Sequence, residues 1–119
     1  WDSVIFASFL DLPDAETPLM KKYREAHAKY TDPAKERWGV FFYAGFGFAE
    51  PLVEALNRAG KDLTREKLIT ALESLKGFKG IMGPVTFTPS QRQGSNAVFI
   101  AKCEKGRAVK LTEWTELDR

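Results

Sequence analysis

The chain has 119 residues, of which 44% are hydrophobic and 29% are charged, and both values are ordinary for a globular protein. At this length the sequence predicts one domain or part of one. The formal net charge of +2 is too small to indicate nucleic acid as a partner. The sequence contains no run of about 18 apolar residues, so no membrane-spanning helix is predicted. Its single cysteine excludes an internal disulfide.

The first predicted elements are a strand and a helix joined by a linker. Residues 3–10 form a short apolar run that is typical of a strand, and a proline-containing acidic linker follows. Thr17 and Pro18 then begin a helix, because threonine caps a helix and proline fits its first position. We expect this helix over residues 18–30.

A second helix is predicted over residues 40–59, with Gly60 as its end. Glycines and Pro51 loosen its first half and allow a kink. The unusual feature of this segment is its aromatic density. Six aromatic residues lie close together: Trp38, Phe41, Phe42, Tyr43, Phe46 and Phe48.

The last third of the chain predicts a third helix and several short strands. Thr64 caps a helix over residues 65–76, which Gly77 ends. The pattern then changes to the period of a strand over residues 85–88 and again over 97–103. A turn with Gly106 at positive φ leads into a returning strand over 108–112, which predicts a C-terminal β-hairpin.

Three motifs could carry chemistry, and each has a simpler structural interpretation. Gly45 and Gly47 lack the lysine and third glycine of a phosphate loop, which favours close backbone approach between helices. Glu50 and Glu54 share a helix face, as exposed glutamates often do. His27 stands among lysines on the first helix, so we expect it to be solvated.

The remaining reactive residue, Cys103, lies in a predicted strand and is expected to be a small buried hydrophobe. No nucleophile has a base partner that the sequence identifies, so the chain is not predicted to be an enzyme. The aromatic cluster is different, because aromatic side chains commonly line apolar ligand sites. Ligand binding and core packing both remain open as its role.

The order of these elements resembles the C-terminal part of periplasmic substrate-binding proteins of the branched-chain amino acid type, which serve ABC transporters. The similarity begins with the apolar strand and its acidic, proline-containing linker. It continues through the helix over 18–30 and through residues 54–60 and 63–68. The most specific stretches are residues 71–75 (ALESL), 82–89 (MGPVTFTP) and 93–99 (QGSNAVF).

The resemblance implies an α/β fold, namely a fragment of a two-lobe type I periplasmic binding protein. Its three helices are followed by short strands and a C-terminal β-hairpin. Residues 1–10 would be a crossing strand from lobe 2, and residues 11–94 the C-terminal helical part of lobe 1. Residues 95–119 would be the return crossing and the lobe 2 hairpin. The two crossings are therefore expected to lie side by side.

The resemblance also implies a function. The protein would be the periplasmic solute-binding component of an ABC importer, without cofactor or enzymatic activity, and its partners would be a small-molecule ligand and a membrane permease. The ligand would be a small amino acid or an aromatic or apolar carboxylate. Phe41 matches the family's cleft-facing position best, and Phe42 and Tyr43 could share it. The extra aromatic residues favour an aromatic or larger apolar compound.

Two other functions remain open at this stage. A ligand-sensing regulatory domain of the same fold would share these features, and a standalone α+β interaction module would bind no ligand. The chain also begins within an apolar run, so we expect it to be a piece of a longer protein. The apolar faces of its helices then need cover, either from the rest of that protein or from a dimer or swapped assembly of the fragment.

Overall fold

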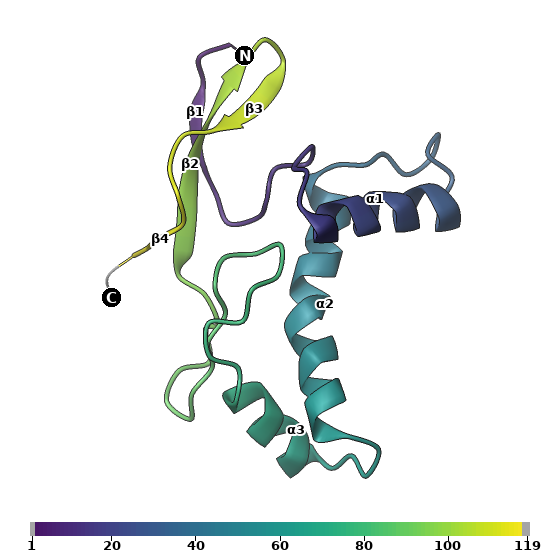
Figure 1. Ribbon diagram of the computed structural model, residues 1–119, viewed down its shortest axis with the longest axis vertical. Coiled ribbons are helices and arrows are strands. Elements are labelled where there is room, and N and C mark those ends of the chain that lie inside the picture. The colour runs from purple at the N-terminus through teal and green to yellow at the C-terminus, as the bar shows by residue number, and fades with distance from the viewer. Residues whose placement is uncertain (1, 118–119) are drawn as a thin grey trace.

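The computed structural model describes residues 2–117. The strands lie to one side, the helices lie to the other, and a long loop over residues 77–95 lies between them (Figure 1). The elements follow the order β1 (Ile5–Ser8), α1 (Pro18–Tyr30), α2 (Val40–Ala59), α3 (Arg65–Glu73), β2 (Ala97–Glu104), β3 (Arg107–Lys110) and β4 (Thr115–Glu116). We call residues 2–8 and 96–117 the sheet region and residues 10–94 the helical region. No helix of the described residues is long and apolar enough to cross a membrane.

The sheet is antiparallel and has β2 at its centre. β1 and β3 pair with β2, and β4 pairs with the start of β2. Ser8 lies opposite Phe99, so β1 ends and β2 begins at the same end of the sheet. This pairing confirms that the two connections to the helical region are neighbours. Their role as crossings between two lobes stays a prediction.

The helix starts follow from local sequence. The Thr17 hydroxyl accepts the Met20 N–H at 3.3 Å, and the Thr64 hydroxyl accepts the Lys67 N–H at 3.2 Å, so both predicted caps are confirmed. α1 and α2 have their predicted bounds. α3 ends at Glu73, earlier than expected, because the Ser74 hydroxyl donates to the Ala71 carbonyl at 2.6 Å and closes the last turn.

The predicted strand over residues 85–88 is wrong. This segment contains only the isolated bridges of Phe78 with Val85 and of Thr88 with Gln91. The Thr86 N–H donates to the Gly94 carbonyl within the same loop, and prolines stand on both sides of the segment. A loop that satisfies its own backbone groups in this way forms no ladder with another strand. The other strands are present, and Gly106 has the predicted positive φ of 76°.

The core of the helical region forms where the linker after β1 lies against α2. Leu10, Met20, Tyr43 and Ile81 are buried there. A Cβ atom added to Gly47 would lie 2.9 Å from the Leu10 Cδ2 atom and 3.0 Å from the Met82 Cγ atom. Gly47 therefore lets side chains approach the α2 backbone closely, whereas a Cβ atom added to Gly45 would meet nothing within 4 Å, so the predicted close approach is absent there. The approaching segments are the linker and the 77–95 loop, not a second helix.

Glu50 joins three parts of the helical region. Its carboxylate accepts the Tyr23 hydroxyl at 2.7 Å and the Ile81 N–H at 2.9 Å. Burial, followed by this hydrogen bond, raises the pKa of the Tyr23 hydroxyl well above its usual range. Because Glu54 instead pairs with Arg58 at 2.8 Å, the two glutamates do not form a paired-carboxylate site.

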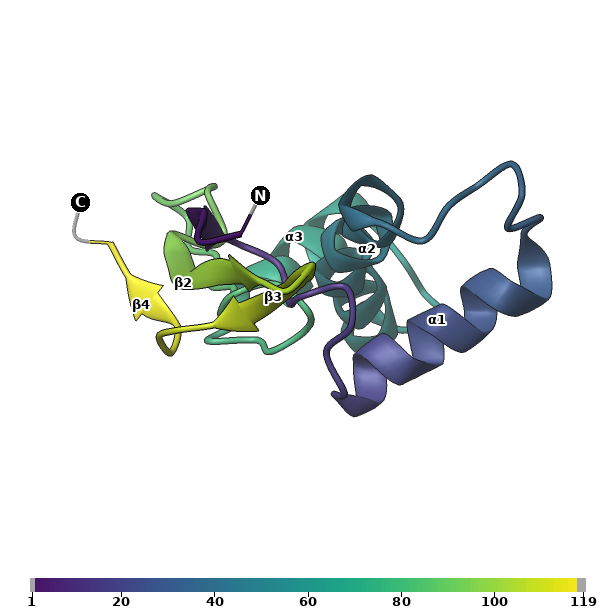
Figure 2. The same ribbon diagram turned by 90° about the horizontal axis from the view of Figure 1, so that it is seen from above.

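The molecule is flatter and more exposed than a compact domain. Its radius of gyration is 16.2 Å, against about 13.5 Å expected for this length. Its accessible surface is 8315 Å², against roughly 6,500 Å² for a monomer of this size. Figure 2 shows the sheet and α1 at opposite sides of α2. The excess surface therefore arises because few layers cover one another.

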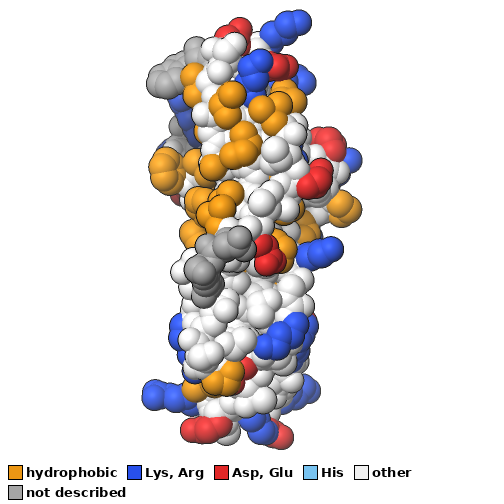
Figure 3. Space-filling view, turned by 90° about the vertical axis from the view of Figure 1, so that its left-hand side faces the viewer, with side chains coloured by type: hydrophobic (Ala, Val, Ile, Leu, Met, Phe, Trp, Pro, Cys, Tyr) orange, Lys and Arg blue, Asp and Glu red, His pale blue; other side chains and the backbone are white. Residues whose placement is uncertain are grey.

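Two apolar surfaces account for much of this exposure. On α2 an outer stripe consists of Phe41, Phe48, Leu52 and Leu56, which recur at helical spacing and are exposed. On the sheet, Ile5 and Val109 flank Lys102 on one face, and both are exposed. Hydrophobic side chains gather over the sheet in the upper half of Figure 3.

Candidate functional site

A pocket of about 420 Å³ lies between the sheet and the first turn of α2. We call it the β1–α2 pocket. Its lining comes from β1, the linker, β3 and α2: Phe6, Ala7, Ser8, Phe9, Leu12, Pro13, Val40, Tyr43 and Ala108. Its volume falls within the usual range of small-molecule sites. The pocket lies where the sheet region meets the helical region.

The side-chain polar groups of this pocket are already bonded within the protein. The Ser8 hydroxyl donates to the Leu10 carbonyl at 2.7 Å. The Tyr43 hydroxyl donates to the Asp11 carbonyl at 2.9 Å. Burial, helped by the nearby charge of Asp11, raises the pKa of Tyr43 to about 12. The pocket therefore offers an apolar lining that suits the hydrophobic body of a ligand.

The three aromatic residues predicted for the site point in different directions. Phe41 is 96% exposed on the first turn of α2. Tyr43 is 2% exposed and lines the β1–α2 pocket. Phe42 is half-buried, and its ring packs edge-on against the His27 ring with a centroid separation of 4.6 Å. Adjacent helix positions are about 100° apart, which explains this separation. Whether any of the three contacts a ligand stays a prediction.

The expectation that His27 is solvated is wrong. Its side chain is buried, and Nε2 lies 2.7 Å from the Glu36 carbonyl oxygen. The Trp38 ring packs near it with a centroid separation of 5.6 Å. The cause is the connection between α1 and α2, which folds back over α1. The Trp38 indole N–H also donates to the Pro13 carbonyl at 2.8 Å, so this connection holds the linker in place.

Cys103 is also less buried than expected. It is partly exposed near the end of β2, although its backbone N–H donates to the Val4 carbonyl at 2.8 Å and its carbonyl accepts the Ser3 N–H at 2.8 Å. The thiol is free. Its position beside Ala108 in the ladder gives it a packing role in the sheet.

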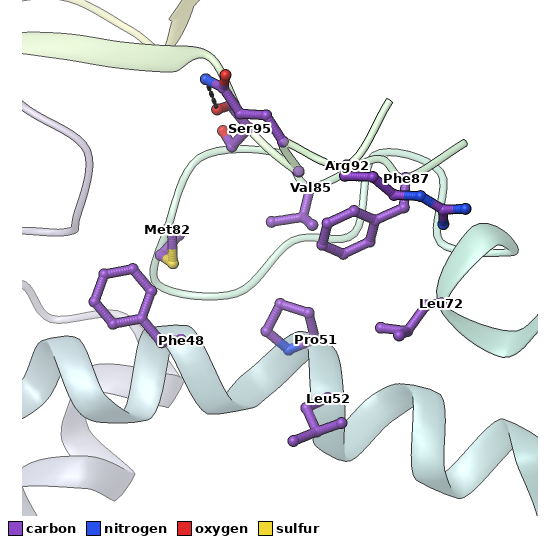
Figure 4. A pocket seen from close by; sticks show the side chains of 11 residues that line it. Phe48, Pro51, Leu52, Leu72, Met82, Val85, Phe87, Arg92 and Ser95 are labelled. Carbon is purple, nitrogen blue, oxygen red and sulfur yellow. Dashed lines mark hydrogen bonds between the residues drawn. The ribbon is translucent and has the colours of Figure 1, made fainter. Parts of the chain in front are cut away.

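A second hollow of about 500 Å³ lies between α2, α3 and the 77–95 loop (Figure 4). Phe48 and Leu52 of the outer stripe form one side of it, and Phe87 of the loop forms another. Arg92 at its rim pairs with Glu73 at 2.8 Å. This hollow continues the outer stripe, and most of its lining is apolar.

Sequence reasoning missed the strand side of the β1–α2 pocket. Phe6 and Phe9 line it from β1 and the linker. Phe9 also stacks on Phe48, with ring centroids 6.3 Å apart. The sequence pattern around these residues predicted only an apolar strand. Their place at the pocket depends on how the sheet meets α2, which no local pattern contains.

A sequence profile described as "Periplasmic binding protein" matches residues 1–108. The chain therefore belongs to the periplasmic binding protein family. A comparison with curated proteins found no match. Solved structures of substrate-binding proteins match nearly the whole chain, which confirms the α/β fold as a fragment of a type I periplasmic binding protein.

The chain is similar to a branched-chain amino acid ABC transporter protein from Thermus thermophilus, solved with bound valine, at 26% identity and a TM-score of 0.82. That match covers 98% of this chain and 34% of the other. It is similar to a fatty acid ABC transporter substrate-binding protein from Thermomonospora curvata at 28% identity and a TM-score of 0.68, covering 96% of this chain and 30% of the other. A periplasmic substrate-binding protein from Ralstonia solanacearum matches at 26% identity and a TM-score of 0.66, covering 90% and 31%. The chain thus spans about a third of the length of these relatives.

Proposed function

We propose that this chain is part of the extracytoplasmic solute-binding component of an ABC importer. The observation that carries the proposal is the family match over residues 1–108. The β1–α2 pocket supports it, because a pocket at the junction of two regions can change shape when the regions move. In this proposal the sheet region and the helical region belong to two lobes, and the solute is held between them.

The proposed solute is a small amino acid or an aromatic or apolar carboxylate. Its hydrophobic part would lie against the β1–α2 pocket, whose side-chain polar groups are already bonded within the protein. One relative was solved with bound valine, and another is described as a fatty acid transporter protein. A solute with a carboxylate and a hydrophobic body is common to both. Its charged end would bind residues outside this chain.

The proposed partner is a membrane permease, and the proposed location is the periplasm. Both come from the family, whose related structures are described as ABC transporter substrate-binding proteins. Closure of the two lobes would desolvate the bound solute and present a defined surface to the permease. The chain would contribute binding and closure to this cycle, and no chemical step.

Phe41 is not among the residues that line the β1–α2 pocket, so it tests whether the proposed site extends beyond that pocket to the exposed side of the first turn of α2. Its side chain makes almost no contact within the described residues, since it is 96% exposed at the open end of α2. If the Phe41 side chain contacts the solute, Phe41→Ala in the intact gene product should raise the Kd about tenfold. The Kd is measured for whichever of L-valine, L-phenylalanine and octanoate binds. The measurement is isothermal titration calorimetry.

Tyr30→Ala is the matched control, because Tyr30 is also an exposed aromatic residue but ends α1. The control should keep the Kd of the parent protein. Both substitutions should change the free energy of unfolding by no more than about 0.5 kcal/mol, as is usual for surface sites. A Phe41→Ala protein that binds as tightly as the control would remove Phe41 from the site.

A further inference from the structure

The sheet region and the helical region are joined by two short connections. In the first, the Ser8 hydroxyl bonds to both the carbonyl and the N–H of Leu10. In the second, the Ser95 hydroxyl accepts the Ala97 N–H at 3.3 Å. Each serine hydroxyl therefore bonds to the residue two positions on. These contacts are local to the two connections.

The extensive packing between elements stays within each region. It runs from strand to strand in the sheet and from α2 to α3 among the helices. The contacts that link the two regions therefore involve loops. One close contact of this kind joins Gly83, in the 77–95 loop, to Trp114, in the connection between β3 and β4, and to Ala97 of β2.

Trp114 is fixed on the sheet side by aromatic and cationic neighbours. Its ring meets the Phe99 ring edge-to-face, with centroids 4.8 Å apart and planes at 90°. The Lys110 ammonium lies 5.2 Å from the Phe99 centroid and 6.0 Å from the Trp114 centroid. These contacts attach the indole to the sheet region.

The same indole lies directly on Gly83. A Cβ atom added to Gly83 would be 3.1 Å from two ring carbons of Trp114 and 2.9 Å from the Ala97 Cβ atom. The next residue toward the helices, Met82, bridges Leu10 and packs against Gly47 of α2. A continuous series of tight contacts therefore runs from the Trp114 ring to α2.

We propose that Trp114 is a positioning residue whose seat on Gly83 sets the angle between the sheet region and the helical region. That angle determines how far the β1–α2 pocket is open, since the pocket has its walls in both regions. The functional meaning of the inference rests on the proposed solute binding. The structural part, the angle between the two regions in the solute-free protein, can be measured without any solute.

The test is a distance measurement between nitroxide labels on the two regions of the intact gene product. Labels at Lys29→Cys on α1 and Arg107→Cys on β3 occupy exposed positions, and Cys103→Ser removes the thiol of this chain. Trp114→Ala should shift the mean distance by about 2 Å or more, or broaden its distribution. Gly83→Ala should shift it as well, because the added methyl group would crowd both the indole and the Ala97 Cβ atom. Trp114→Phe should restore most of the parent distance.

Val109→Ala, on the outer face of β3, is the matched control and should leave the distance unchanged. The inference is overturned if Trp114→Ala and Gly83→Ala both keep the parent distance distribution while unfolding more easily, since Trp114 would then only stabilise the sheet. If Trp114→Ala does not fold, Gly83→Ala and Trp114→Phe decide the outcome. The distance between the labels can be measured even if the protein binds no solute. The proposed solute binding and the proposed role of Trp114 can therefore fail separately.

Discussion

Replacing Leu10 by alanine is expected to lower the free energy of unfolding by about 2–5 kcal/mol, the usual cost of a large-to-small change in a packed core. Leu10 is fully buried, and its backbone bridges Met82. Its side chain approaches the Gly47 backbone of α2 more closely than any Cβ would allow. The cavity would therefore open where the linker, the 77–95 loop and α2 meet. Urea unfolding of the intact gene product measures the effect.

Leu111→Ala is the control for this measurement, because it removes the same atoms from a side chain that is 49% exposed. We expect the control to change the free energy of unfolding by less than about 0.5 kcal/mol. Equal losses in the two variants would mean that the contact of the linker with α2 contributes little to stability.

A polypeptide of these 119 residues alone is expected to self-associate. Its accessible surface of 8315 Å² exceeds the value for a compact monomer by roughly 1,800 Å². The outer stripe of α2 and the outer face of the sheet are both apolar and open. Covering about 300 Å² of apolar surface contributes roughly 7 kcal/mol, which is comparable to the whole stability of a small domain.

Sedimentation velocity on the isolated 119-residue polypeptide checks this expectation. Leu52→Lys places a charge in the middle of the outer stripe and should shift the distribution toward the monomer. Lys22→Glu on α1 changes an exposed charge away from the stripe and should not do so. If the unsubstituted polypeptide is monomeric and unfolds cooperatively, its exposed apolar surfaces do not need to be covered by another chain.

The helices could be predicted from the sequence because their limits depend on neighbouring residues. Thr17 and Thr64 cap the helices that follow them, and Gly60 takes the positive φ that ends α2. The strands were less predictable. β4 is only a pair of residues that meet Ala97 and Val98, and nothing in its local pattern signals this long-range pairing.

The candidate site was predictable only as a region. Aromatic density pointed to the start of α2, but the direction of each ring depends on tertiary packing. Tyr43 is buried because the Asp11 carbonyl lies within reach of its hydroxyl. His27 is buried because the connection between α1 and α2 folds over it, although its helical neighbours are charged. Contacts made by loops decide both cases, and loops carry no periodic signal.

The proposal that the protein captures a small amino acid or an aromatic or apolar carboxylate is tested most directly by a thermal-shift titration of the intact gene product. L-valine, L-phenylalanine and octanoate are the probes, with spermidine as a cationic control. We expect at least one acid to raise the Tm, by an amount that grows with the logarithm of its concentration above the Kd. We also expect spermidine to leave the Tm unchanged. The proposed binding would be contradicted if the protein unfolds cooperatively and none of the three acids shifts its Tm at millimolar concentration.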